Sequence, residues 1–335
     1  QQKVLFEYKE IIGYIIEHLN VSETESQAVL EAIIVQHGLL IERTKGIYSF
    51  SHLTFQEYFV AKEVEASGLI EELVSYMSDK SWREVFVLVS VMIKSTKDTE
   101  NLLKQMQQAV SKFKNNDEEI QEFFNWIQKK SQAINSSYKL AAVRAFYYVK
   151  AFDNILETEG NLERVSHVAK DLATILGFNI DSILVSMVDT EIKIEHNLAI
   201  DAFLAITFSF ASDTLETVRN GENNLATTLN KSLSDVLDHS ISLTINSDKK
   251  IDKELGNHLS DLKKMRSFDV GELHQEWWIA KGESWIEDLK KIMNKYRNIR
   301  KNWQFNEEQA QYLLNYCTAN LLMVECLDEV CDISD

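Results

Sequence analysis

Residues 39–61 read LLIERTKGIYSFSHLTFQEYFVA, and this stretch contains the change of pattern that decides the fold. Residues 39–43 and 47–51 are short β-prone runs joined by Thr44, Lys45 and Gly46. Gly46 can adopt the positive φ that a tight hairpin turn requires. From Leu53 the apolar spacing is helical. We therefore expect a β-hairpin followed directly by a helix.

The residues before this stretch predict two helices. Apolar residues from position 4 to position 19 form one stripe of helical period. Ser22 and Glu25 have the spacing of a capping box, so a second helix is expected to begin there, and Gly38 suits its C-terminal cap. Two helices and a hairpin are the layout of a partial winged helix, which we place at residues 1–66.

After Ser67 and Gly68, the best linker candidate, the pattern is helical throughout. Short polar breaks favour antiparallel helices stacked side by side, although no fixed repeat is visible. The chain has 10 glycines and no proline among its 335 residues, which argues against a mainly β protein. The predicted fold is mainly α: the partial winged helix, then an irregular α-solenoid or multi-helix domain at 67–335. The expected helices are 70–78, 82–94, 99–113, 117–133, 138–157, 162–176, 181–195, 197–219, 223–244, 248–266, 269–280, 283–301 and 305–330.

The net charge of the chain indicates which kinds of partner it can bind. Acidic residues outnumber basic ones 52 to 35, giving a net charge of −17. Such a surface repels phosphate backbones and anionic lipid, and the lysine pairs at 249–250, 263–264 and 290–291 are interleaved with acids. We expect neither specific duplex binding nor membrane association. Three cysteines within the last 20 residues, Cys317, Cys326 and Cys331, suit a reducing cytoplasm better than a disulfide framework.

Few residues suggest chemistry. No phosphate-binding loop, dinucleotide fingerprint or zinc-protease motif occurs, so we predict no catalytic residue and no metal site. Asp235 and His239 could pair or bind metal, and a plain surface pair is the favoured interpretation. Four tryptophans near the C-terminal end could form a peptide- or ligand-binding surface, although core packing is the favoured alternative; they are Trp277, Trp278, Trp285 and Trp303.

Three segments of the sequence resemble motifs of a known protein family. Phe50, His52 and the run LTFQEYF with Ala61 resemble the end of the winged-helix domain of NACHT-family NTPases. Residues 82–86, WREVF, resemble the motif that opens the following helical region in bacterial, notably cyanobacterial, members. Residues 300–309, RKNWQFNEEQ, resemble the end of a C-terminal helical domain of the same proteins. Residues 98–295 are similar only in general character.

The resemblance implies a regulatory role. NACHT proteins are signalling NTPases in which ADP holds a closed monomer, and nucleotide exchange with a trigger permits oligomerisation. It implies a non-catalytic sensor portion, a partner in an upstream NACHT domain in cis, and ATP or ADP with Mg bound only in the full-length protein. Bacterial members are associated with defence against phage. His52 would contact the β-phosphate of ADP, for which an imidazole N–H is suited.

Other interpretations stay open at this stage. His52 could instead pack at the base of the wing. Phe55, Tyr58 and Phe59 are expected in the core, with Gln56 and Glu57 as an interface or hydrogen-bonding pair. The alternative function is a helical scaffold for protein association with no nucleotide-linked switch.

Overall fold

The computed structural model describes residues 3–113, 117–134, 139–152, 160–176, 195–266, 274–299, 301 and 303–333. The expected helix at 181–195 falls almost wholly outside them. The described chain forms two compact units, residues 1–114 with 318–335 and residues 115–317. The first unit is therefore discontinuous in sequence, because the second is inserted between its two parts. The expected division at residues 66 and 67 stays a prediction.

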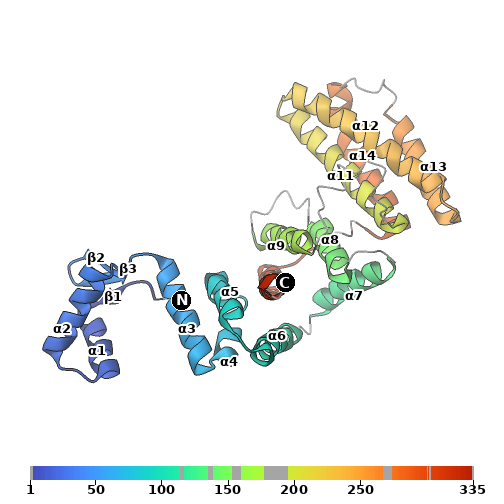
Figure 1. Ribbon diagram of the computed structural model, residues 1–335. Helices are drawn as coiled ribbons and strands as arrows, with labels where there is room; N and C mark the ends of the chain where they lie inside the picture. The colour runs from blue at the N-terminus through green and yellow to red at the C-terminus, as the bar shows by residue number, and fades with distance from the viewer. Residues whose placement is uncertain are drawn as a thin grey trace. The chain divides into compact units, whose positions relative to one another are not determined.

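The first unit begins with a small winged helix (Figure 1). Its three strands form an antiparallel sheet in the order β1-β3-β2. The elements of this unit are β1 (Phe6–Glu7), α1 (Tyr8–Leu19), α2 (Glu23–Glu31), the π-helical turn η1 (Ala32–Gln36), β2 (Leu40–Thr44), β3 (Ile47–Phe50), α3 (Leu53–Ser67), α4 (Ile70–Val74), the 3-10 turn η2 (Lys80–Trp82), α5 (Arg83–Met92) and α6 (Thr96–Ser111).

Local sequence signals explain the winged helix. Ser22 and Glu25 form the expected capping box, with the Ser22 backbone N–H donating to the Glu25 carboxylate at 2.8 Å. Gly46 has φ +77° in the hairpin turn between β2 and β3. The helix expected from residue 4 instead begins at Tyr8, because Phe6 and Glu7 pair with β3 as a third strand. A two-residue strand is too short to produce a recognisable period.

Two apolar clusters hold the first unit together. One lies inside the winged helix and is formed by Ile11, Ile12, Ile15, Leu30, Leu40 and Tyr48. The other joins α3, α4, α5 and α6 to the C-terminal part of α15 (Glu307–Ile333), through residues that include Val85, Phe86, Val89, Leu322 and Cys326. Residues 319–326 of α15 thus complete the core that begins in α3.

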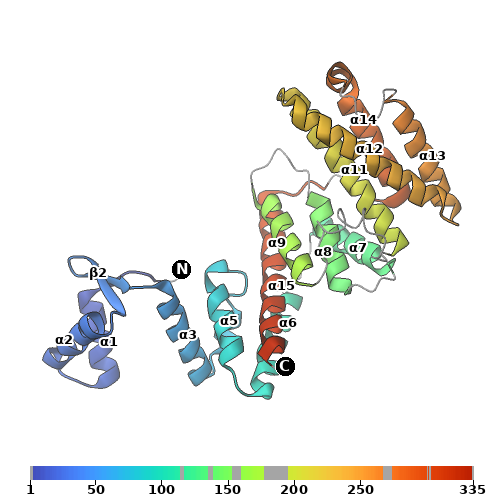
Figure 2. The ribbon, with the colours of Figure 1, turned by 45° about the horizontal axis from the view of Figure 1, so that its top comes forward.

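The second unit is all helical in its described part (Figure 2). Two groups of helices pack among themselves. The α7–α9 group comprises α7 (Glu118–Gln132), α8 (Leu140–Phe152) and α9 (Asn161–Ile175), and the α11–α14 group comprises α11 (His196–Arg219), α12 (Asn223–Ile245), α13 (Lys250–Lys264) and α14 (Gln275–Arg297). The mainly α fold, with a winged helix followed by a helical domain, is confirmed.

One predicted break between two helices was wrong. Residues 275–297 form one helix, α14, where two helices at 269–280 and 283–301 were predicted. Gly282 lies inside this helix, and a Cβ there would approach Trp278 Cε3 to 2.7 Å and Leu215 Cδ1 to 3.0 Å. Gly282 therefore allows α14 to pack closely against α11 and does not end a helix. A glycine in a sequence pattern can indicate either close packing or a helix end, so the pattern alone does not decide between them.

Candidate functional site

His52 lies at the N-cap of α3, directly after β3 and Ser51. Its backbone is extended, with φ −129° and ψ 140°, and its side chain makes no capping hydrogen bond. The exposed imidazole has Phe55 as its aromatic neighbour, in an edge-to-face contact with ring centroids 5.8 Å apart. The structure therefore leaves the ring of His52 open to solvent at the junction of the wing and the helix.

A groove of about 640 Å³ lies beside this junction. Its lining includes Ser51 and Leu53, the two residues that flank His52 in the sequence, together with Arg43 and Ser49 of the wing. Arg43 lies at a β-bulge, where the register of β2 against β3 shifts between Glu42 and Thr44. A bulge changes the direction of a side chain, and here Arg43 Nε donates to Ser49 Oγ at 2.8 Å. The lining also includes the Asp79 carboxylate, so the groove presents a guanidinium and hydroxyl groups, which can bind phosphate or carboxylate, beside one negative charge.

The aromatic face of α3 corrects an expectation. Phe55, Tyr58 and Phe59 were expected in the core, yet they are 38%, 43% and 45% exposed. Tyr58 and Phe59 contact each other edge to face, with centroids 5.6 Å apart. The spacing of positions 55, 58 and 59 does place them on one side of the helix, but α3 packs through its other side, which a residue-type assignment does not reveal. The exposed group made by Phe55, Tyr58 and Phe59 is called the α3 aromatic face below.

The buried side of α3 carries the two polar residues of the same motif. Gln56 and Glu57 are buried, together with Ala61 and Val64. Gln56 Nε2 donates to the backbone carbonyl of Lys3 at 2.9 Å, which ties the start of the chain to α3. Burial, with the nearby Glu84 carboxylate, raises the pKa of Glu57. Gln56 therefore helps to hold α3 in place, while Tyr58 and Phe59, which follow in the sequence, are left exposed.

The described contacts of Trp82 and Arg83 in the WREVF segment hold parts of the fold together. Trp82 stacks on Tyr76, with ring centroids 4.3 Å apart and an angle of 11° between the rings. Arg83 makes a two-point ion pair with Glu325 of α15, from Nε at 2.9 Å and from Nη2 at 3.0 Å. This bidentate pairing joins α5 to the last helix of the chain.

The segment at 300–309 caps the last helix. The Asn306 side chain accepts from the Gln309 backbone N–H at 2.9 Å, and the Gln309 side chain accepts from the Asn306 N–H at 2.8 Å. Trp303 and Phe305 stack with parallel rings, 6.0 Å apart, and both contact Phe123 of α7. The recognisable residues of this segment thus fix the start of α15.

The other candidates prove to be structural within the described residues. Trp278, Trp285 and Trp303 are buried, which agrees with core packing, whereas Trp277 is only half-buried. His239 Nδ1 lies 3.0 Å from the backbone carbonyl of Asp235, one turn earlier in its own helix. The described part of the chain contains no group of three or more metal-ligating side chains. Burial raises the pKa of the Cys317 and Cys326 thiols to about 12, which keeps them protonated and unreactive.

Comparison with known proteins identifies both ends of the chain. Residues 7–64 match the family described as a winged helix-turn-helix domain C-terminal to NACHT. Residues 230–335 match the family described as NACHT C-terminal helical domain 2. The chain is a C-terminal NACHT-associated segment. No curated protein and no solved structure matches it. Both matches are to domains that lie C-terminal to the NACHT NTPase module, and neither is to that module itself.

One helix of the NACHT-associated segment meets the length and apolarity expected of a membrane span. Among the described residues this is α11, and 78% of its most apolar window is buried inside the protein. Such burial is typical of the core helix of a globular domain.

Proposed function

We propose that this segment is the non-catalytic regulatory and sensor portion of a NACHT-type NTPase switch. The observation that carries the proposal is the junction of the wing and α3, where the exposed His52 and the α3 aromatic face lie on a winged helix of the NACHT-associated family. A contiguous exposed apolar face marks an interaction surface. Its proposed partner is the upstream NACHT domain in cis, which would cover Phe55, Tyr58 and Phe59 in the closed, autoinhibited state.

His52 is proposed to sense the nucleotide. In the full-length protein its imidazole would donate to the β-phosphate of ADP, with ATP or ADP and Mg held by the NACHT domain. The exposed ring and the neighbouring groove with Arg43 and Ser49 support a role in anion recognition. The contact would exist only in the closed state, so it would favour that state over the open one.

The test uses the longer protein that contains the NACHT domain. His52→Ala removes one charge-assisted hydrogen bond, worth about 1.5–3 kcal/mol, and therefore raises the open population about 10- to 100-fold. We expect weaker ADP retention and oligomerisation or signalling without a trigger, measured by nucleotide release and size-exclusion chromatography. His37→Ala is the matched control, because His37 is an exposed histidine of the same winged helix. Retention of ADP equal to that of the parent protein, with no spontaneous assembly, would contradict the proposed role.

The biological setting is part of the same proposal. A cytoplasmic role in bacterial defence against phage follows from the family association, with the helical domain recognising a protein or other trigger and oligomerisation following activation. The net charge of −17 supports a trigger other than duplex nucleic acid and an absence of membrane binding. Loss of protection from phage on deletion of the helical domain, with the NACHT domain intact, is the expected result in infected cells.

The alternative of a helical scaffold without a nucleotide-linked switch makes a different prediction. A scaffold would assemble with its partner equally in the presence of ADP or ATP. The regulatory segment would assemble in a nucleotide-dependent manner, and the His52→Ala variant would weaken that dependence. Partner capture by the longer protein at saturating ADP and at saturating ATP therefore distinguishes the two functions.

A further inference from the structure

Asp201 lies where the α7–α9 group and the α11–α14 group of the second unit meet. It is 1% exposed and stands on α11 within an otherwise apolar stretch. Arg297, at the end of α14, donates from Nε to Asp201 Oδ1 at 2.6 Å. Lys130 of α7 and Tyr147 of α8 donate to Oδ2 at 2.6 Å and 2.7 Å. One carboxylate thus receives donors from both groups of helices.

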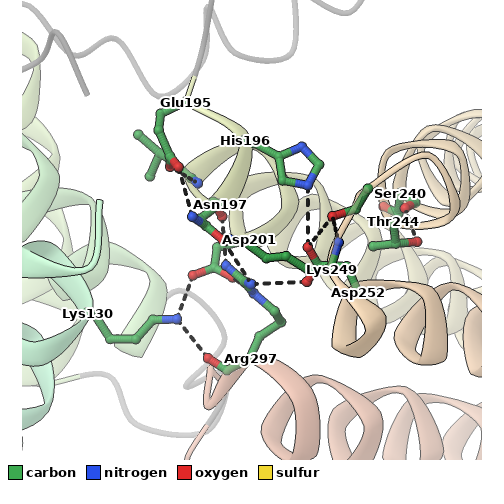
Figure 3. Close-up of polar contacts among 12 residues, drawn as sticks. Lys130, Glu195, His196, Asn197, Asp201, Ser240, Thr244, Lys249, Asp252 and Arg297 are labelled. Atoms are coloured by element: carbon green, nitrogen blue, oxygen red, sulfur yellow. Dashed lines mark hydrogen bonds and ion pairs between the residues drawn. The ribbon is translucent and has the colours of Figure 1, made fainter. Parts of the chain in front are cut away.

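The C-terminal end of α14 adds two more connections between the groups. Lys130 Nζ also donates to the backbone carbonyl of Arg297 at 2.7 Å (Figure 3). Trp126 Nε1 donates to the carbonyl of Asn298 at 2.8 Å. These carbonyls belong to the partially negative end of a helix, where a cation such as Lys130 is favoured. The connection is therefore made by long side chains that reach from α7 to a carboxylate and a helix end.

A second carboxylate extends the network to α13. Arg297 Nη1 lies 3.6 Å from Asp252 Oδ1, and its Nη2 donates to the backbone carbonyl of Asn197 at 3.0 Å. Asp252 Oδ2 accepts from Ser247 Oγ at 2.7 Å and lies 3.4 Å from His196 Nε2 (Figure 3). Two carboxylates, Asp201 and Asp252, thus face two cations, Lys130 and Arg297, and the buried charges balance.

This balance makes the network sensitive to the loss of any member. Burial lowers the pKa of Lys130. Burial also acts to lower the pKa of Arg297, but Asp201, Tyr147 and Asp252 together outweigh it and raise that pKa. Both cations depend on the Asp201 carboxylate to compensate for the water that they have lost. Removing that carboxylate leaves Lys130 and Arg297 with only Asp252, 3.6 Å from Arg297, as a buried counter-charge, so the cost falls on the boundary between the helix groups.

We propose that Asp201 and its donors Lys130, Tyr147 and Arg297 form a latch, and that opening it separates the two helix groups while each stays folded. The reason is that each group has its own packing: α8 packs on α9 and α7, while α11 packs on α12 and α14. The latch gives the second unit a defined place at which it can change shape. It rests on the geometry of the unit alone and does not depend on the proposed function.

The test is Asp201→Asn in the full chain, followed by hydrogen exchange and small-angle scattering. Asparagine keeps the shape of the side chain but cannot neutralise Lys130 and Arg297. We expect amide exchange at the end of α7, the start of α11 and the end of α14 to accelerate about 10- to 100-fold. The radius of gyration should increase, and far-ultraviolet circular dichroism should be unchanged. Glu283→Gln is the control, since Glu283 pairs with Arg219 at 2.9 Å on the exposed surface of the same helix group.

Two results would overturn the latch. One is an unchanged exchange pattern, and the other is acceleration spread evenly over α11 to α14 with loss of helical signal, which is the behaviour of an ordinary core residue. Lys130→Met decides the matter if the Asp201 variant does not fold, because it leaves the Asp201–Arg297 pair neutral. It should accelerate exchange at the same three helix ends to a smaller extent, and evenly distributed or absent changes would again refute the proposal.

Discussion

Glu57 shows how one buried residue of a recognisable motif makes the stability of the fold depend on pH. It lies on the buried side of α3, and burial and the Glu84 carboxylate raise its pKa above the ordinary value. The folded state therefore binds a proton at Glu57 more readily than the unfolded state does. By linkage, the free energy of unfolding decreases as the pH rises from the unfolded pKa through the folded pKa.

Glu57→Gln should remove this pH dependence. Glutamine is neutral at every pH, so the variant should be more stable than the parent protein at pH 7 to 8, and the advantage should disappear near pH 4, where the parent carboxyl is protonated. Chemical denaturation across that pH range measures the difference. Glu63→Gln, at an exposed position of the same helix, is the control and should show no such trend. An advantage that grows as the pH falls would contradict the assignment.

At the scale of elements, α12 and α13 approach closely at Gly256. A Cβ at this position would lie 2.6 Å from Thr244 Oγ1 and 2.8 Å from Ile245 Cγ1. Gly13 offers a comparison in the interior of α1, where a Cβ would meet nothing within 4 Å. Both glycines carry the same unfavourable helix propensity, and they differ in the space around them.

Substituting alanine at each position separates propensity from packing. Gly13→Ala should stabilise the protein by up to about 1 kcal/mol through helix propensity. Gly256→Ala should destabilise it by about 1–3 kcal/mol, because the methyl group forces α12 and α13 apart. Urea denaturation of the two variants gives both values. Equal stabilisation by the two substitutions would show that α12 and α13 can separate at no cost.

Elements with local signals could be predicted from the sequence, and long-range arrangements could not. The capping box of Ser22 and Glu25 and the hairpin turn at Gly46 depend on neighbouring residues, so both were found. The division of α3 into an exposed aromatic side and a buried polar side depends on where α5 lies, which no local pattern states. The burial of Asp201 could have been suspected from the sequence, because it is an acidic residue inside the apolar run 198–208. Lys130 and Arg297 could not, because nothing in the sequence distinguishes them from the other cations of their helices.

At the scale of the whole molecule, α15 contributes to the core of the first unit from the far end of the sequence. Leu322 is 3% exposed and belongs to the cluster that contains Phe86 and Val89 of α5. Leu327, on the same helix, is 39% exposed. The two leucines therefore differ in burial but share residue type and helix.

Leu322→Ala should destabilise the first unit by about 2–5 kcal/mol, since it leaves a cavity in the core. Leu327→Ala should change the stability by less than about 0.5 kcal/mol. Calorimetry gives the overall loss, and hydrogen exchange should place it in α5 and α6 rather than in α12 and α13. Accelerated exchange in both units to the same degree would show that they unfold as one.

The discontinuous first unit has a consequence for the order in which the nascent chain can fold. The apolar surface of α5 is synthesised early, but Leu322 and Cys326 that complete its core emerge after the whole of the second unit. Translation at about 5–20 residues per second puts roughly 10–40 s between these events. During that interval Phe86 and Val89 lack their final partners on the ribosome. A chaperone that binds nascent chains should therefore crosslink to α5 while residues 115–317 are being made.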